Sequence, residues 1–167
     1  MLSLSKYRRV ISSNYNKSIK LNQDLTKPEV KANIIARINK LNAQSPAQWG
    51  KMNVAQMLAH CQAQLRVALG DEKLKHSLLG KILGRWAKKS MMDVKPFSKN
   101  LPTAPTFLIK HQPEFEKEKN NLIGIITRFQ PENITTDPHP FFGKMTLDEW
   151  SFGTWKHLDH HLKQFGV

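Results

Sequence analysis

The sequence has one cysteine and no long hydrophobic run, and each absence excludes a class of protein. Cys61 is the single cysteine among 167 residues, so no intrachain disulfide forms, which suits a reducing cytoplasm. No apolar stretch approaches the roughly 18 residues that a transmembrane helix needs. The first twenty residues lack the continuous apolar segment and the small-residue cleavage site of a signal peptide. These absences predict a cytoplasmic protein without a membrane among its partners.

Acidic residues are scarce: 13 aspartates and glutamates stand against 26 lysines and arginines, giving a formal net charge of +13. Most of the excess is lysine, spread along the chain with some crowding over residues 73–99. Proteins that bind nucleic acids specifically concentrate arginine and aromatic residues on one face or in a known motif. No zinc-finger, RNP-like or basic-zipper spacing occurs here. A solvated, lysine-rich surface is therefore preferred, and nucleic-acid binding is only the third hypothesis.

Strand-like alternation is also missing, and apolar residues recur at the spacing of amphipathic helices. A shorter helix near residues 78–86 is expected to be broken or frayed by Gly80 and Gly84. Three prolines over residues 95–105 predict an irregular loop, and long loops often wall a substrate site. Four main helices are predicted, over residues 26–41, 54–68, 113–130 and 145–166.

The economical architecture for these segments is an all-α four-helix bundle with a long crossover loop. It would occupy residues 26–167 as one domain, preceded by a basic N-terminal arm over residues 1–25. Gly166 stands where a glycine would end the last helix. Three helix starts carry the capping-box pattern: Thr26 with Glu29, Asn53 with Gln56, and Thr146 with Glu149.

The last helix carries a cluster of histidines. His157 and His161 are four residues apart, so both lie on one side of the helix, at the edge of its apolar face. His160 points to the far side with Lys156 and Lys163, where it is expected to contact a neighbour or the surface. Two histidines at this spacing can chelate one metal ion, although a histidine-rich helix end would look the same. The apolar face consists of Leu147, Trp155, Leu158, Leu162 and Phe165.

The metal hypothesis needs a third ligand, and His60 lies at the edge of the apolar stripe of the second predicted helix. Taken alone, His60 would most often be a partly buried histidine with a hydrogen-bonded ring. Cys61 falls nearer the centre of the same stripe and is expected to be buried and inert rather than a nucleophile.

Three motifs resemble those of a known family. They are W-x-x-M-N-V-A-Q-M-L-A-H at Trp49–His60, H-P-F-F-G-K-M-T-x-x-E-W at His139–Trp150 and H-L-D-H-H-L-K-Q-F-G at His157–Gly166. Together they resemble the DinB/YfiT-like superfamily of metal-binding four-helix bundles, and more narrowly an uncharacterised DinB-like subfamily. Residues 71–100 carry little of this resemblance. Carried over by position, the metal triad of that family would be His60, His157 and His161.

The resemblance implies a metal-dependent enzyme. Three neutral imidazoles leave an open position on a divalent ion, and the ligand type suits zinc or nickel. Characterised relatives resemble thiol-dependent transferases or hydrolases, so a low-molecular-weight thiol is the expected co-substrate and a small electrophile the expected substrate. The main alternative is a non-catalytic bundle that binds a small molecule or a metal. Bundles of this kind often pair through exposed apolar faces, so a homodimer is among the expected partners.

Three further residues are weaker candidates for the site. His139, in a proline-flanked loop, would act as a proton donor or support a ligand, although a loop histidine without a role is as good an explanation. Gln64, one turn after His60, would orient a ligand, but a surface amide fits its position better. Trp150 would wall the pocket, while simple core packing is preferred.

Overall fold

The computed structural model describes residues 22–74 and 78–167, and its regular structure is helical throughout this part of the chain. An isolated bridge between His139 and Gly143 is the closest approach to a strand among these residues. The prediction of an all-α fold is therefore confirmed, whereas most of the predicted N-terminal arm lies outside the described residues. The helices are α2 (Pro28–Asn39), α3 (Val54–Ala68), α4 (Leu78–Met91), α5 (Phe115–Arg128) and α6 (Leu147–Gln164), with short 3₁₀ helices η1 (Pro105–Phe107) and η2 (Pro131–Asn133).

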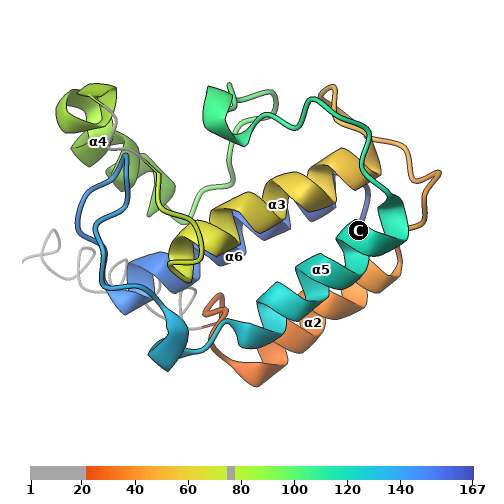
Figure 1. Cartoon of the computed structure of the whole chain (residues 1–167), viewed down its shortest axis with the longest axis horizontal. Coiled ribbons are helices and arrows are strands. Elements are labelled where there is room, and N and C mark those ends of the chain that lie inside the picture. The colour runs from red at the N-terminus through yellow and green to blue at the C-terminus, as the bar shows by residue number, and fades with distance from the viewer. Residues whose placement is uncertain (1–21, 75–77) are drawn as a thin grey trace, which may run out of the picture.

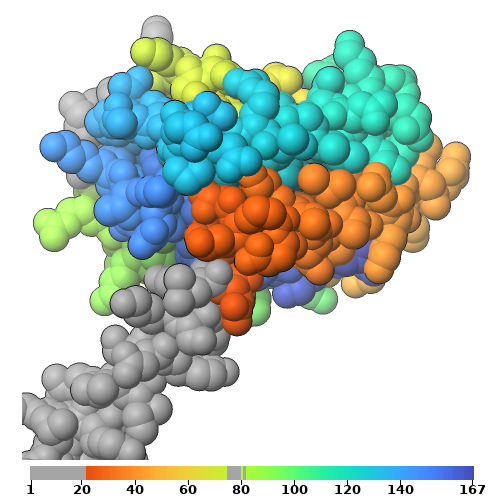
Figure 2. Space-filling view, turned by 90° about the horizontal axis from the view of Figure 1, so that it is seen from below, coloured from red at the N-terminus to blue at the C-terminus, as the bar shows by residue number. Residues whose placement is uncertain are grey.

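Four of these helices form the predicted bundle. The helices α3 and α2 each pack against both α5 and α6 (Figure 1). On the face shown in Figure 2, α2 lies directly beside α5. Burying each large apolar side chain between the helices contributes about 1.5–3 kcal/mol. Residues from all four helices are fully buried in this core, among them Ile34, Ile38, Met57, Leu58, Leu65, Leu122, Ile126, Leu158 and Leu162.

Two predicted capping boxes are present. The Asn53 side chain accepts a hydrogen bond from the backbone N–H of Gln56, and the Gln56 side chain accepts one from the backbone N–H of Asn53. The same exchange joins Thr146 and Glu149 at the start of α6. These bonds satisfy amides that a helix start otherwise leaves unpaired, which fixes where α3 and α6 begin.

The capping box predicted at Thr26 is wrong. Lys27 occupies the N-cap position of α2, without a side-chain cap. The Thr26 hydroxyl instead donates to the Asp24 carboxylate at 2.6 Å, and the Ser151 hydroxyl donates to the same oxygen at 2.6 Å. The hydroxyl oxygen of Thr26 therefore does not accept from the first amides of the helix, which begins one residue later than a cap at Thr26 would place it. Asp24 thereby joins the entry to α2 to α6.

The apolar face predicted for α6 is confirmed except at its first residue. Leu158, Leu162 and Phe165 are buried in the core, whereas Leu147 is 40% exposed because it opens the helix at the edge of the bundle. Gly166 has a φ of +78°, a backbone conformation that glycine adopts without strain, and α6 ends beside it as predicted.

The helix α4 is the main departure from the predicted fold. It is continuous over 14 residues and is not broken at Gly80 or Gly84. Both glycines face the backbone of Phe141, so close that a Cβ atom on Gly80 would lie 2.8 Å from the Phe141 carbonyl oxygen. These glycines therefore serve close backbone packing rather than flexibility.

A buried lysine holds the far end of α4. Lys156 of α6, predicted to point outward, is only 4% exposed. Its ammonium donates to the carbonyl oxygens of Ser90, Met91 and Asp93 at 2.7–3.4 Å. The last carbonyls of a helix have no partner within it and carry partial negative charge, so a lysine there satisfies and neutralises them.

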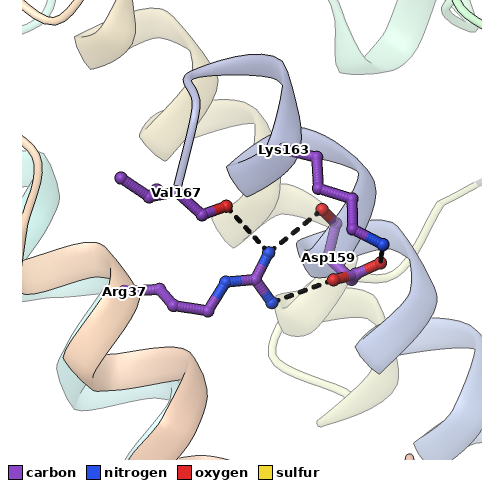
Figure 3. A network of polar contacts seen from close by, with 4 residues as sticks. All are labelled: Arg37, Asp159, Lys163 and Val167. Carbon is purple, nitrogen blue, oxygen red and sulfur yellow. Dashed lines mark hydrogen bonds and ion pairs between the residues drawn. The ribbon is translucent and has the colours of Figure 1, made fainter.

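A polar network joins α2 to the C-terminal end of α6 (Figure 3). The Arg37 guanidinium donates to Asp159 at 2.9 Å and to the Val167 carbonyl at 3.0 Å, while Lys163 pairs with the other Asp159 oxygen at 2.8 Å. The Arg37 and Asp159 side chains are only 17% and 14% exposed, so water screens this pair less than a surface pair. The network fixes the segment of α6 that carries the histidines.

No helix in the described part of the chain is both long and apolar enough to span a membrane.

The glycine contacts of α4 lead to a prediction with an internal control. In Gly84→Ala the new methyl group collides with the Phe141 carbonyl, and we expect a loss of about 1–3 kcal/mol of stability together with faster amide exchange in α4. Gly124 of α5 has nothing within 4 Å of a Cβ position, so Gly124→Ala should stabilise by about 0.5–1 kcal/mol. Urea unfolding and hydrogen exchange measure both. Equal effects of the two substitutions would contradict the packing assigned to Gly84.

Candidate metal centre

Two neighbouring helices bring the three predicted ligand histidines together. The side chain of Gln164, at the end of α6, donates a hydrogen bond to the carbonyl oxygen of Trp49, just before α3. The end of α6 thus lies beside the start of α3, and the two helices run antiparallel. His60 in the middle of α3 thus faces the last turns of α6. The Nε2 atoms of His60 and His157 are 3.0 Å apart. One ring nitrogen from each of His60, His157 and His161 lies within 4.8 Å of the others.

Carbonyl groups fix the orientation of two of these rings. The Nδ1 atom of His60 lies 3.0 Å from the Phe107 carbonyl oxygen, and Nδ1 of His161 lies 2.8 Å from Oε1 of Gln164. A carbonyl oxygen only accepts, so each Nδ1 carries the proton and each Nε2 keeps its lone pair. The Gln164 amide is itself held in place, because its NH₂ group donates to the Trp49 carbonyl at 2.7 Å. This is how metal-binding histidines are usually supported.

Burial keeps the three rings neutral. Burial, followed by repulsion from His60, lowers the pKa of His161 to about 3. Burial also lowers the pKa of His60, and burial together with the neighbouring His161 and His60 lowers the pKa of His157 well below its usual value. Each of the three imidazoles is therefore neutral near pH 7 and has one unprotonated ring nitrogen, which is the form that binds metals.

The donor set fits a divalent metal ion. Tetrahedral zinc with Zn–N distances near 2.05 Å separates its ligand nitrogens by about 3.3 Å. The observed separations, from 3.0 Å to within 4.8 Å, bracket this value, so small ring movements suffice. His60 and His161 are buried, and His157 is partly exposed. Three nitrogens would leave the fourth position of a tetrahedral ion free for another ligand, as in catalytic zinc sites.

His160 lies beside the cluster but outside it, as predicted. Its ring packs against Trp49 and Phe97, with centroids 5.7 Å from each, and against His161 at 5.1 Å. Its half-buried position also lowers its pKa, chiefly through desolvation. His160 therefore supports the wall of the site rather than supplying a ligand.

The predicted loop over residues 95–105 and the adjoining η1 lie against the centre. Phe97 contacts His160, and the Lys99 ammonium lies 4.6 Å from the Trp49 ring centroid. The Phe107 carbonyl accepts a hydrogen bond from Nδ1 of His60. In Figure 1 this segment rises from the α4 side of the bundle to η1 above α3. The loop thus supplies both a wall and a hydrogen-bond acceptor to the site.

Two polar side chains one turn from the ligands have unpaired oxygens. Oε1 of Gln64, one turn after His60, is buried without a hydrogen-bond partner. The hydroxyl of Thr154, three residues before His157, is also buried and unpaired. Gln64 was a weaker candidate from the sequence, for which a surface amide was preferred. Thr154 was missed, although its spacing places it on the histidine side of α6 and could have revealed it.

The structure does not bring His139 and Trp150 to the three histidines. His139 accepts hydrogen bonds at Nδ1 from the amides of Phe141 and Phe142, at 3.0 and 3.1 Å, and its ring lies 5.4 Å from Trp150. Trp150 precedes His157 by seven residues, about 10 Å along α6. It packs in the core, 2% exposed, and borders a separate cavity of about 290 Å³.

Cys61 is buried as predicted. It is 1% exposed, and this burial raises the pKa of its thiol far above the usual value. A protonated, inaccessible thiol is a poor nucleophile and a poor metal ligand. Cys61 therefore belongs to the packing of α3.

The buried His139 gives a prediction about pH. Burial lowers its pKa to about 4, whereas the unfolded chain titrates near 6.5. Between these values the unfolded state binds a proton that the folded state does not, so stability falls as the pH is lowered, by up to about 3 kcal/mol from this group. His139→Asn keeps an acceptor for the two amides but does not titrate. Urea unfolding at pH 7.5 and pH 4.5 should show a smaller loss in the variant, and equal losses would contradict the assignment.

Comparison with known proteins identifies the family. A family model described as a protein of unknown function (DUF1569) matches residues 20–166. No curated protein and no solved structure shows significant similarity to the chain. The match covers all the helices described above and the three clustered histidines, and the chain therefore belongs to the DUF1569 family.

Proposed function

We propose that this protein is a metal-dependent enzyme of the DinB-like type, which holds zinc or nickel at His60, His157 and His161. One observation carries the proposal: three neutral imidazoles converge, and Phe107 and Gln164 turn the lone pairs of two of them inward. A divalent ion placed between the rings would be coordinated by these lone pairs in place of the hydrogen bond that now joins His60 and His157.

The chemistry of the donor set favours an anionic fourth ligand. The groups that shift the pKa values of the three histidines include no carboxylate among the described residues. A divalent ion bound there would keep its full +2 charge in a largely buried site, which favours binding of an anion. A bound metal lowers the pKa of a coordinated water or thiol and so supplies a nucleophile near neutral pH.

The proposed reaction is transfer of a low-molecular-weight thiol to a small electrophile. The thiol sulfur forms a bond to the electrophilic carbon, the leaving group departs with the bonding electrons, and the thiol proton passes to solvent. Hydrolysis would replace the thiol with water. The oxygens of Gln64 and Thr154, one turn from His60 and His157, are buried without a hydrogen-bond partner and would accept a hydrogen bond from a reactant that entered beside them.

Metal-dependent turnover of a thiol tests this function. Wild-type protein dialysed against zinc or nickel should contain about one metal ion per chain and consume a thiol such as glutathione or cysteine in the presence of an electrophile such as 1-chloro-2,4-dinitrobenzene. His157→Ala should lose both properties. His111→Ala removes an exposed histidine elsewhere and serves as the control.

The alternatives give different results in the same experiment. Metal binding without turnover across a panel of thiols and electrophiles would support the non-catalytic bundle. Absence of metal from folded wild-type protein would refute the proposal. Affinity for nucleic acid that falls steeply with salt would support the third hypothesis.

The role of Gln164 can be tested separately from activity. Gln164→Leu removes the acceptor that holds the His161 proton, so we expect metal affinity to fall about 10–100-fold, as for other such supporting residues. Gln164→Glu keeps an acceptor at the same position and should bind the metal more tightly than Gln164→Leu. Competition with a chromogenic chelator measures both affinities. Equal affinity in wild type and Gln164→Leu would show that this contact does not support the centre.

A further inference from the structure

The helix α4 exposes its large apolar side chains to solvent. Ile82 is 79% exposed, Trp86 75% and Leu83 44%. Ile82 and Trp86 are four residues apart and therefore adjacent on one face, with Leu83 beside them. Figure 1 shows α4 standing apart from the body formed by the other four helices. A cluster of this kind on a monomer usually marks an interaction site.

Packing of the opposite face fixes this orientation. Gly80 and Gly84 lie against the Phe141 backbone, and the Met91 side chain reaches within 2.9 Å of a Cβ position on Gly153. The Lys88 ammonium pairs with Glu149 at 2.7 Å. Because the inward face is built from glycines in close backbone contact, the helix cannot turn Ile82 and Trp86 inward without losing these contacts.

The exposed face is also basic. No acidic residue occurs over Leu78–Met91, and the exposed Arg85 and Lys89 lie next to Ile82 and Trp86 at helical spacing. Lys88, by contrast, is already paired with Glu149. The partner of this face must therefore offer both an apolar layer and negative charge.

We propose that α4 binds the surface of an anionic lipid membrane. Ile82, Leu83 and Trp86 would enter the boundary between headgroups and acyl chains, while Arg85 and Lys89 contact anionic headgroups. A short helix with an apolar face, tryptophan and flanking basic residues suits this interface. A second copy of the chain would place the same basic residues against each other, and nucleic acid would leave the apolar side chains without a partner.

The proposal departs from the expectation that the protein has no membrane partner. That expectation rested on the lack of a spanning segment, whereas a helix that lies in the interface needs no spanning length. The proposal is independent of the metal centre, because α4 contributes none of the three histidines.

Co-sedimentation of the full chain with lipid vesicles tests the proposal. We expect binding to phosphatidylcholine vesicles containing phosphatidylglycerol and little binding to phosphatidylcholine alone. Ile82→Ser/Trp86→Ser should reduce this binding roughly tenfold or more, since it removes two inserting side chains. Arg85→Glu/Lys89→Glu should reduce it as well. The matched control is Leu101→Ser/Leu108→Ser, which removes two apolar side chains that are 52% and 50% exposed elsewhere and should bind as wild type does.

Three outcomes would overturn the proposal. In the first, wild-type protein fails to bind the anionic vesicles. In the second, Ile82→Ser/Trp86→Ser binds them as well as wild type does, which would assign the binding to charge elsewhere in the chain. In the third, sedimentation velocity without lipid would show a wild-type dimer that Ile82→Ser/Trp86→Ser dissociates while vesicle binding is unchanged. Circular dichroism confirms that each variant is folded.

Discussion

The convergence of three uncharged imidazoles between α3 and α6 is the constraint on which the rest of the structure depends. Two Nε2 atoms 3.0 Å apart in a buried site cannot both carry a proton, so one of them donates and the other accepts. Such an arrangement persists because the surrounding structure imposes it. Capping boxes fix the starts of both helices, and Gln164 at the end of α6 bonds both His161 and the Trp49 carbonyl just before α3. The two helices are thereby held so that the three rings stay close enough together to hold a metal ion.

Helices hold the three histidines on one side, and a loop contacts them on the other. The partly buried network of Arg37 and Asp159 fixes the end of α6 from the α2 side. On the other side, Phe107 and Phe97 belong to an irregular segment that contacts the site through single side chains and carbonyls. Ligand geometry thus rests on helices, whereas access rests on a loop, a division common in enzymes.

The sequence predicted local features well and close packing poorly. Apolar periodicity and capping residues placed α3 to the residue and the N-cap of α6 at Thr146, and the spacing of His157 and His161 predicted that two of the three clustered histidines lie on one side of a helix. The failures have a common cause. The glycines of α4 were predicted to break the helix because the Phe141 backbone that they contact is distant in sequence. Lys156 was predicted to be exposed because the carbonyl groups to which it donates belong to another helix. Phe107 and Gln164 were missed for the same reason, since the contacts that each makes are between segments distant in sequence.

The X-ray absorption spectrum of zinc-loaded protein tests the central claim most directly. We expect one zinc per chain, with three imidazole nitrogens at about 2.0–2.1 Å and one further light atom. When a thiol is added, a sulfur atom at about 2.3 Å should replace that light atom. The spectrum of His161→Ala should lose one imidazole. A folded protein that binds no zinc, or a first shell with four imidazoles and no change on adding thiol, would contradict a three-histidine centre with an open position.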